Sequence, residues 1–164
     1  MKRLYLVRHA KSSREEPGMS DIDRPLLEKG IQRTQKVIRF LKEKKVKIDL
    51  IISSPAERAF QTAILVARGM DYPEKEIRLE RKIYDGYYDR ILDLIYSIPN
   101  QVDSLMIFGH NPTITILSNL FLNPGIDPLP TTGTVCISFD TDKWEKIPSV
   151  EPVKEFVVIP KQLR

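Results

Sequence analysis

The sequence is poor in the features that usually mark secreted or membrane proteins. It has one cysteine in 164 residues, so it can form no internal disulfide, which agrees with a reducing compartment. No apolar run approaches the roughly 18 residues that a membrane-spanning helix needs. The apolar stretch LYLV (4–7) is also shorter than the core of a signal peptide, which takes about 7–15 residues. These absences favour a cytoplasmic protein without a membrane partner.

The composition is typical of a globular protein with one domain. The chain is 41% hydrophobic and 29% charged, with a formal net charge of +4, and it contains no low-complexity tract. We therefore expect residues 1–164 to form a single domain. Basic residues mix with glutamates in helical patterns such as KVIRFLKEKKVK (36–47), which is typical of a solvated helix face. Aromatic residues do not interleave with them, so we expect no nucleic-acid partner.

Short apolar runs alternate with amphipathic segments, and this alternation predicts the fold. We expect strands at 3–7, 49–53, 77–80, 104–108, 134–140 and 155–160, with Cys136 as a buried strand thiol. We expect helices over 28–44, 54–69, 89–97 and 114–122, and loops at 10–25 and 84–86. Strand–helix alternation of this kind predicts an α/β fold, a three-layer α/β/α sandwich around a mainly parallel sheet.

Two of the predicted helices carry start signals in the sequence. Ser54, Pro55 and Glu57 have the residue types of a capping box, in which the serine side chain accepts a backbone hydrogen bond. Asn111 followed by Pro112 indicates an asparagine cap in the same way. We therefore expect Ser54 and Asn111 to cap the helices that follow them.

The only two histidines both follow directly on predicted buried strands. His9 comes after RLYLVR and His110 after SLMIFG, while Arg58 lies in the first turn of the helix after DLIIS. Ligands of such sheets bind beyond the carboxyl ends of the strands. We therefore expect Arg8, His9, Arg58 and His110 to meet at one edge of the sheet.

Two imidazoles and two guanidinium groups suit a phosphate dianion better than a metal ion. A neutral imidazole can attack phosphorus, and the phosphohistidine that forms is labile enough for water to cleave. The planar fork of an arginine donates two parallel hydrogen bonds to phosphoryl oxygens. The residues thus predict phosphoryl transfer through His9 with no metal and no cofactor.

Three segments at these positions resemble the motifs of a known enzyme family. LYLVRHAKS, SSPAERAFQTA and FGHNPTI are similar to the motifs of the histidine phosphatase superfamily, whose fold is called phosphoglycerate-mutase-like. RHAKS, SDIDRPLLEKG and LPTTGTVCISFD resemble its compact SixA-like branch of phosphohistidine phosphatases. The resemblance implies a catalytic domain with His9 as nucleophile and with Arg8, Arg58 and His110 as phosphate-binding residues.

The proton donor of the reaction has four candidates in the sequence. Asp21 falls where the SixA-like branch has an aspartate, and we take it as the catalytic acid. Asp23 is adjacent, and Glu80 and Asp85 follow the second site helix, so these three remain alternatives. For Asp23 and Arg24, a structural role that holds the loop in place is as good an interpretation as a catalytic one.

The segments between the motifs are short, which bears on the substrate. Without an insertion that could close over the site, an open site suits a phosphorylated side chain on a protein better than a small sugar phosphate. A phosphohistidine also tolerates a weakly placed acid, because its P–N bond is weak. We therefore expect a phosphohistidine phosphatase. The alternatives are a phosphatase of small sugar or nucleotide phosphates and a non-catalytic phosphate-binding module.

Overall fold

The computed structural model describes residues 1–14 and 16–164 and contains one six-stranded sheet. The strands are β1 (Lys2–Arg8), β2 (Leu50–Ser53), β3 (Arg78–Leu79), β4 (Ser104–Gly109), β5 (Thr134–Phe139) and β6 (Val153–Val158). Their order across the sheet is β3-β2-β4-β1-β5-β6. The pairs β1–β4, β2–β4 and β2–β3 are parallel, and β5 is antiparallel to both of its neighbours. The prediction of a mainly parallel sheet is confirmed, with β5 as the one reversed strand.

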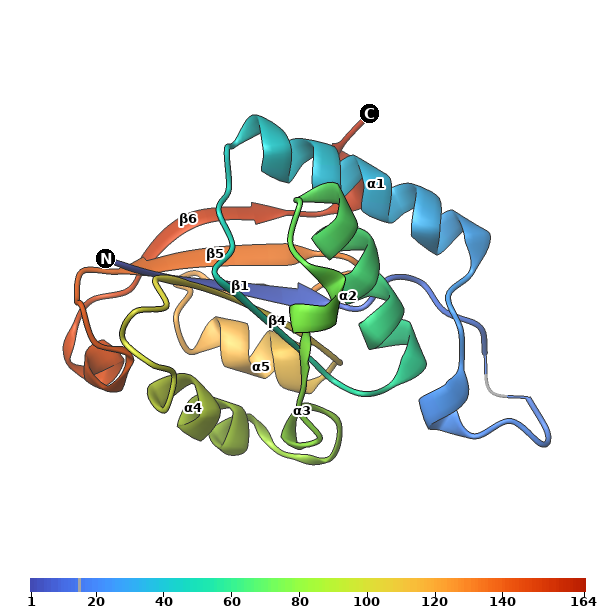
Figure 1. Ribbon diagram of the computed structural model, residues 1–164, viewed down its shortest axis with the longest axis horizontal. Coiled ribbons are helices and arrows are strands. Elements are labelled where there is room, and N and C mark those ends of the chain that lie inside the picture. The colour runs from blue at the N-terminus through green and yellow to red at the C-terminus, as the bar shows by residue number, and fades with distance from the viewer. Residues whose placement is uncertain (15) are drawn as a thin grey trace.

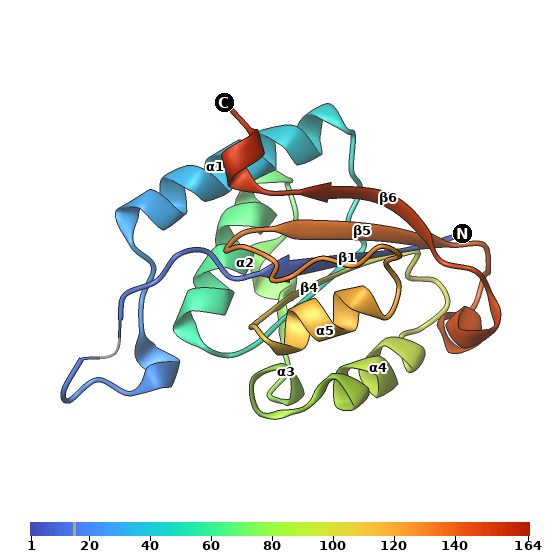
Figure 2. The same cartoon turned by 180° about the vertical axis from the view of Figure 1, so that it is seen from behind.

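Helices cover both faces of the sheet. The α-helices are α1 (Glu28–Glu43), α2 (Glu57–Gly69), α3 (Lys82–Asp85), α4 (Tyr88–Tyr96) and α5 (Thr113–Asn119). Short 3₁₀ helices lie at Asp21–Asp23, Glu74–Glu76, Trp144–Ser149 and Pro160–Gln162. Figure 1 shows α1 and α2 on one face of the sheet and α4 and α5 on the other, and Figure 2 shows the same layers from behind. The three-layer α/β/α prediction is confirmed.

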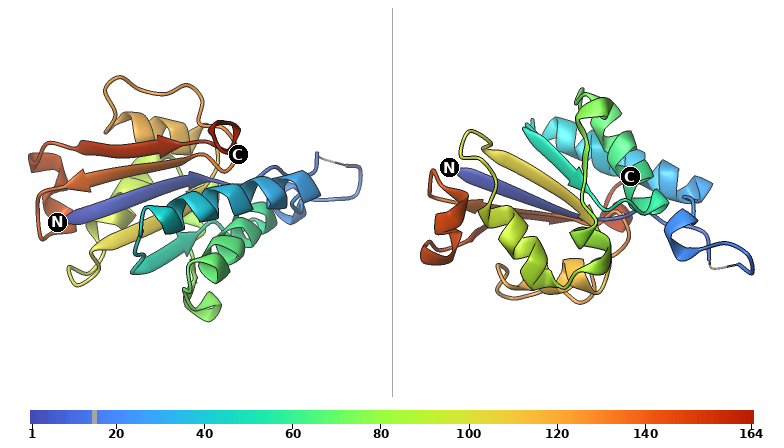
Figure 3. Two further views of the ribbon diagram at one scale, coloured as in Figure 1. Left: turned by 90° about the horizontal axis from the view of Figure 1, so that it is seen from above. Right: turned by 60° about the horizontal axis from the view of Figure 1, so that its bottom comes forward.

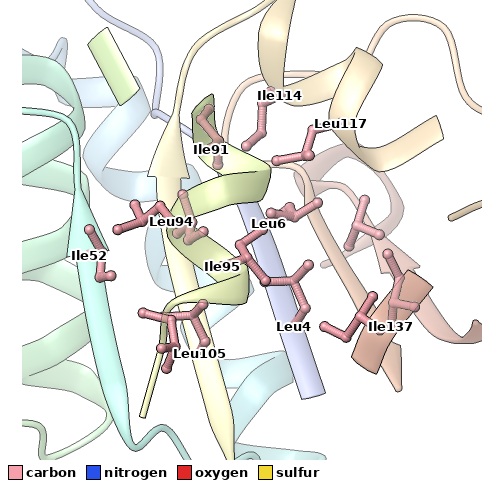
Figure 4. Packing of buried hydrophobic residues seen from close by; sticks show 14 of the residues in the cluster. Leu4, Leu6, Ile52, Ile91, Leu94, Ile95, Leu105, Ile114, Leu117 and Ile137 are labelled. Carbon is pink, nitrogen blue, oxygen red and sulfur yellow. The ribbon is translucent and has the colours of Figure 1, made fainter. Parts of the chain in front are cut away.

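The central strands are buried on both faces, which explains their continuous apolar runs. In β1, Leu4 and Leu6 face α4 and α5, whereas Tyr5 and Val7 face α1 and α2. Figure 4 shows Leu4 and Leu6 packed with aliphatic residues of the neighbouring strands and of α4 and α5. Cys136 is buried in β5, as expected. Because successive side chains of a strand point to opposite faces, this alternation fixes the register of the sheet.

Two expected helix caps are wrong, because each side chain is used elsewhere. Helix α2 begins at Glu57 with Ala56 as its cap, and no side chain caps it. Ser54 lies further upstream, where its hydroxyl accepts the N–H of Ala56 and contacts His110. Helix α5 is capped by Pro112 and ends at Asn119 rather than 122. The amide of Asn111 instead donates to the carbonyl of Leu129.

Two connecting segments also bear on the predictions. Residues 84–86 were expected to form a loop. This prediction is wrong for Tyr84 and Asp85, which belong to the single-turn helix α3, whereas Gly86 lies outside the helix as its C-cap. The expected 10–25 loop is mostly irregular, with a 3₁₀ turn at Asp21–Asp23, and its residue 15 lies outside the described part. Figure 3 shows this segment extending beyond the carboxyl end of β1.

In the described part of the chain, no helix combines the length and the apolar character that crossing a bilayer requires.

Candidate active site

The two histidines meet at the carboxyl ends of neighbouring parallel strands. In the β1–β4 register, Arg8 is opposite Gly109, so His9 and His110 are the residues that follow the paired strand ends. The N–H of His9 donates to the carbonyl of Gly109 at 3.1 Å. The two imidazole rings have centroids 5.2 Å apart. The expected juxtaposition of the two imidazoles is therefore present.

Helix α2 is attached to the same edge of the sheet by a hydrogen-bond relay. The hydroxyl of Thr62 donates to the carbonyl of Arg58 and accepts the N–H of Ala10. The N–H of Ser54, which precedes the helix, donates to the carbonyl of Phe108 in β4. These contacts hold the first turn of α2, with Arg58, beside the residues that follow His9.

The ring of His9 has a defined tautomer. Its Nδ1 lies 2.7 Å from the carbonyl oxygen of Ala10, and a carbonyl can only accept, so Nδ1 carries the proton. The other ring nitrogen, Nε2, then keeps its lone pair. His9 is 8% exposed, and burial, together with the charges of Arg58 and Arg8, lowers its pKa to about 4. Near neutral pH, His9 is therefore an uncharged imidazole with an unprotonated Nε2.

The ring of His110 is oriented by Ser54. His110 Nε2 lies 2.8 Å from the hydroxyl oxygen of Ser54, which also accepts the N–H of Ala56. Among the described residues, the Ser54 hydroxyl proton has one acceptor within reach, His110 Nε2, and this contact places the ring proton on Nδ1. Burial and the nearby His9 and Arg58 lower the pKa of His110 to about 3. A neutral His110 can thus still donate a hydrogen bond from Nδ1.

Unpaired buried donors are concentrated at this site. In the described part of the chain, four buried side-chain polar atoms have no hydrogen-bond partner, and three of them are Arg8 Nε, Arg58 Nε and His110 Nδ1. A buried donor without a partner costs about 1–3 kcal/mol, so such groups call for an explanation. A tetrahedral oxyanion has acceptors for all three. The arrangement can therefore bind a phosphoryl group.

Asp21 is held as a carboxylate by three donors. One of its oxygens accepts hydrogen bonds from Arg58 at 3.0 Å and from the Tyr84 hydroxyl at 2.8 Å. The other accepts a hydrogen bond from Arg24 at 3.0 Å. Partial burial alone would raise the pKa of Asp21, but the hydrogen bonds from Tyr84 and Arg58 outweigh it and lower the pKa. Asp21 is thus predominantly ionised near neutral pH.

The three alternative acids lie in other contacts. Asp23 is exposed and accepts a hydrogen bond from Ser20. Glu80 pairs with Arg78, and Asp85 pairs with Arg81 on the surface of α3. Among the four candidates, Asp21 is therefore the one that the structure places against Arg58.

Tyr84 and Ser54 are site residues that sequence reasoning missed. Tyr84 donates to Asp21 and packs edge-on against His110, with ring centroids 5.6 Å apart. The sequence pattern predicted Ser54 only as a helix cap. Its position directly after the second buried strand could have indicated a place in the site, as it did for His9 and His110. Tyr84 had no such signal, because it lies in a segment with weak local patterning.

The site lies at a corner of the sheet, at the carboxyl ends of β1 and β4. A cavity of about 520 Å³ lies at the opposite end of the parallel strands, where it is lined by Arg3 and Ser104 and by none of Arg8, His9, Arg58 and His110. The described residues contain no group of three or more histidine, cysteine, aspartate or glutamate side chains that could hold a metal ion. The chemistry of the corner is that of an anion site.

Comparison with known proteins agrees with this geometry. The sequence model of the histidine phosphatase superfamily (branch 1) matches residues 4–85. An uncharacterised protein of Mycobacterium tuberculosis (strain H37Rv) is 31% identical over 112 residues, which are 68% of this chain and 67% of the relative. The match to the family model includes Arg8, His9 and Arg58.

Solved structures extend the similarity over nearly the whole chain. The crystal structure of a candidate SixA phosphohistidine phosphatase from Agrobacterium tumefaciens is 27% identical, with a TM-score of 0.80, and the match covers 97% of this chain and 98% of that one. A protein histidine phosphatase SixA complexed with tungstate has the same fold, with a TM-score of 0.83 at 21% identity and 99% coverage of both chains. The chain belongs to the histidine phosphatase superfamily, in its SixA-like branch, and is a phosphatase, a hydrolase acting on phosphoric bonds.

Proposed function

We propose that this phosphatase removes the phosphoryl group from phosphohistidine on a protein, through a covalent intermediate on His9. The observation that carries the proposal is the hydrogen bond from His9 Nδ1 to the carbonyl of Ala10. It leaves the Nε2 lone pair free for attack, while burial keeps the ring neutral. We also propose that residues 1–164 act as one catalytic domain.

The phosphate-binding residues in this proposal are Arg8, Arg58 and His110. Their unpaired donors support the assignment, because Nε of each arginine and Nδ1 of His110 are buried without a partner. Preorganised donors of this kind stabilise the charge that builds up on the phosphoryl oxygens in the transition state. The amino-terminal end of α2 adds the positive end of a helix dipole beside Arg58.

The reaction has two displacement steps. In the first, the Nε2 lone pair of His9 forms a bond to phosphorus while the P–N bond of the substrate breaks, and the leaving imidazole takes the bonding electrons and a proton from Asp21. In the second, a water oxygen bonds to phosphorus and gives a proton to the Asp21 carboxylate while the P–Nε2 bond breaks. Its electrons return to His9, and inorganic phosphate leaves. Neither step needs a metal or an organic cofactor.

Asp21 is the proposed proton donor, and its setting favours phosphohistidine over alkyl phosphates. Since Tyr84 and Arg58 lower its pKa, Asp21 is protonated only in a small fraction of molecules at neutral pH. An alkoxide leaving group depends on a proton, for which a placed acid typically contributes about 10²–10⁴-fold. An imidazole leaves more readily, so a weak acid is sufficient for it.

The proposal is tested by trapping the phosphoenzyme. Purified protein is mixed with a radiolabelled phosphohistidine peptide, quenched at alkaline pH and assayed for label on the chain. We expect rapid labelling of the wild type and none of His9→Ala, which should also lose turnover of the peptide and of an aryl phosphate. EDTA should leave wild-type turnover unchanged. Turnover that survives in His9→Ala would refute the mechanism.

A small phosphate ester is the second candidate substrate, and the Asp21→Asn variant separates the two. The variant removes the acid but leaves an amide that can still accept hydrogen bonds from Arg58 and Tyr84. We expect kcat on the phosphohistidine peptide to fall by less than about tenfold, because imidazole needs little protonation. If sugar or nucleotide phosphates are better substrates of the wild type and their turnover collapses in the variant, the protein-substrate proposal is wrong.

A further inference from the structure

Basic residues form a continuous surface beside His9. Two lie on the segment that follows β1, three lie on α1 and one lies in the last 3₁₀ helix. We call this surface the basic patch: Lys11, Arg14, Lys29, Arg33, Lys36 and Lys161. Lys29, Arg33 and Lys36 are spaced by four and three residues, which places them on one face of α1. Lys11 lies close enough to Lys29, Arg33 and Arg14 that their charges, Lys29 first, lower its pKa.

Among the residues that the structure describes, no ion pair neutralises the charge of the basic patch. Ion pairs elsewhere in the described residues join Arg68 to Glu74 and Arg81 to Asp85, but none includes a member of the patch. The six cations of the patch exceed the formal net charge of +4 for the whole chain, so the remainder of the chain is net negative. Like charges gathered without counter-charges destabilise a fold slightly, and this arrangement points to an anionic partner.

The backbone connects the patch directly to the catalytic corner. The carbonyl of Lys11, two residues after His9, accepts the N–H of Leu27 at 2.9 Å. Gly30 lies against the same carbonyl so closely that a Cβ atom would collide with it. This contact seats Lys11 on the first turn of α1, beside Lys29 and Arg33. A partner bound to the patch therefore lies next to the site of attack.

A groove of about 370 Å³ continues the patch away from His9. Arg33, Lys36 and Lys161 are its basic residues, and its apolar residues are Pro130, Ile159, Pro160 and Leu163. Thr131 also lines the groove, and the next residue, Thr132, donates its N–H to the carbonyls of Arg8 and His9. The groove thus combines cations with aliphatic surface, and through Thr131 it adjoins the residue that contacts the end of β1.

We propose that the basic patch and this groove bind an acidic, partly apolar segment of the phosphorylated protein substrate, an inference that rests on the proposed function. Carboxylates of the partner would pair with the cations, and its apolar side chains would cover the prolines and the aliphatic residues. An extended surface of this kind matches a protein partner. The residues that line the groove include no aromatic side chain on which a base could stack, which argues against single-stranded nucleic acid.

The test compares two phosphohistidine peptides of equal length. One has four glutamates flanking the phosphohistidine, and the other has four glutamines. At low ionic strength we expect kcat/KM of the wild type to favour the glutamate peptide by at least about tenfold, with the preference shrinking as salt is added. The Lys29→Glu/Arg33→Glu variant should lose this preference. The matched control, Lys75→Glu/Lys146→Glu, reverses the charge of two exposed lysines outside the patch. It should keep the preference for the glutamate peptide.

A binding assay separates failure of this inference from failure of the proposed function. A fluorescent, unphosphorylated glutamate peptide is titrated with each variant and followed by anisotropy. If neither phosphopeptide is hydrolysed while an aryl phosphate is, the proposed substrate is wrong, and this titration still decides whether the patch binds acidic chains. Equal affinity of wild type and Lys29→Glu/Arg33→Glu would overturn the inference. Binding of a thymidine oligonucleotide as tight as that of the glutamate peptide would also overturn the inference, because the patch would then not distinguish a protein segment from nucleic acid.

Discussion

Buried His9 and partly buried His110 should make the stability of the protein fall in mild acid. Burial lowers the pKa of His9 to about 4 and that of His110 to about 3, whereas an unfolded histidine has a pKa of about 6.5. Between these values the unfolded chain binds protons and the folded chain does not. The free energy of unfolding is therefore highest above about pH 6.5 and falls as the pH drops toward the folded-state values.

The size of the effect at pH 5 depends little on the folded-state pKa values. An unfolded imidazole is almost fully protonated at pH 5, while one with a folded pKa well below 5 stays neutral. Each such histidine lowers the free energy of unfolding by about 2 kcal/mol between pH 8 and pH 5. The two histidines together give about 4 kcal/mol, a large part of the stability of an ordinary domain.

The measurement is urea unfolding at pH 8, 6 and 5 in phosphate-free buffer, followed by the fluorescence of the buried Trp144. The lowered pKa values of Asp21 and Asp103 affect stability mainly below about pH 4. The change in stability between pH 8 and pH 5 therefore reports on the histidines. The chain has no third histidine, so the His9→Asn/His110→Asn variant should unfold with nearly the same free energy at pH 8 and pH 5. A wild type equally stable at both pH values would refute the claim that the imidazoles are buried and neutral.

Three further substitutions test how the site is held together. Ser54→Ala removes the hydroxyl that orients His110, and we expect kcat/KM on an aryl phosphate to fall about tenfold or more, with an unchanged far-UV spectrum. Arg58→Lys loses the planar fork that contacts Asp21 and that we propose to bind the phosphoryl group, so steady-state kinetics should show a drop in kcat/KM of about a hundredfold. Gly30→Ala drives a methyl group into the carbonyl of Lys11. It should lower the free energy of unfolding by about 2 kcal/mol, as measured in urea; unchanged stability would show that this contact can relax.

The fold was predictable because its signals are local and repeated. The strands β1 and β4 contain uninterrupted apolar runs, and the periodicity of α1 predicts its end to within one residue, with Glu43 rather than 44 as the last helical residue. The juxtaposition of His9 and His110 was also predictable, since the ends of parallel strands share one edge of the sheet. The direction of β5 was not predictable, because a buried antiparallel strand has the same pattern as a parallel one.

The details of the site depend on contacts between residues far apart in the chain. Ser54 and Asn111 have the residue types of helix caps, but their side chains bond to His110 and Leu129 instead. A local motif cannot show that a distant group competes for the same hydroxyl or amide. Tyr84 reaches Asp21 across 63 positions, and neither residue has a sequence feature that predicts the pair. The basic residues on α1 matched a solvated helix face, and only the packing of Lys11 against α1 brought them next to His9.

The burial that destabilises the protein in acid also suits the proposed attack by His9. A protonated His9 would have no lone pair to attack phosphorus, and the positive charges of Arg8 and Arg58 favour its neutral form. The two arginines also give the corner more hydrogen-bond donors than acceptors. Asp21 accepts a hydrogen bond from Arg58, but among the described residues Arg8 Nε, Arg58 Nε and His110 Nδ1 have no acceptor. In the proposed complex, a bound phosphoryl group supplies the missing acceptors and returns part of the free energy that the unpaired donors cost. Binding of the anion and stability of the fold would therefore be linked at this corner, and the linkage follows from placing neutral imidazoles and buried guanidinium nitrogens beside adjacent strand ends.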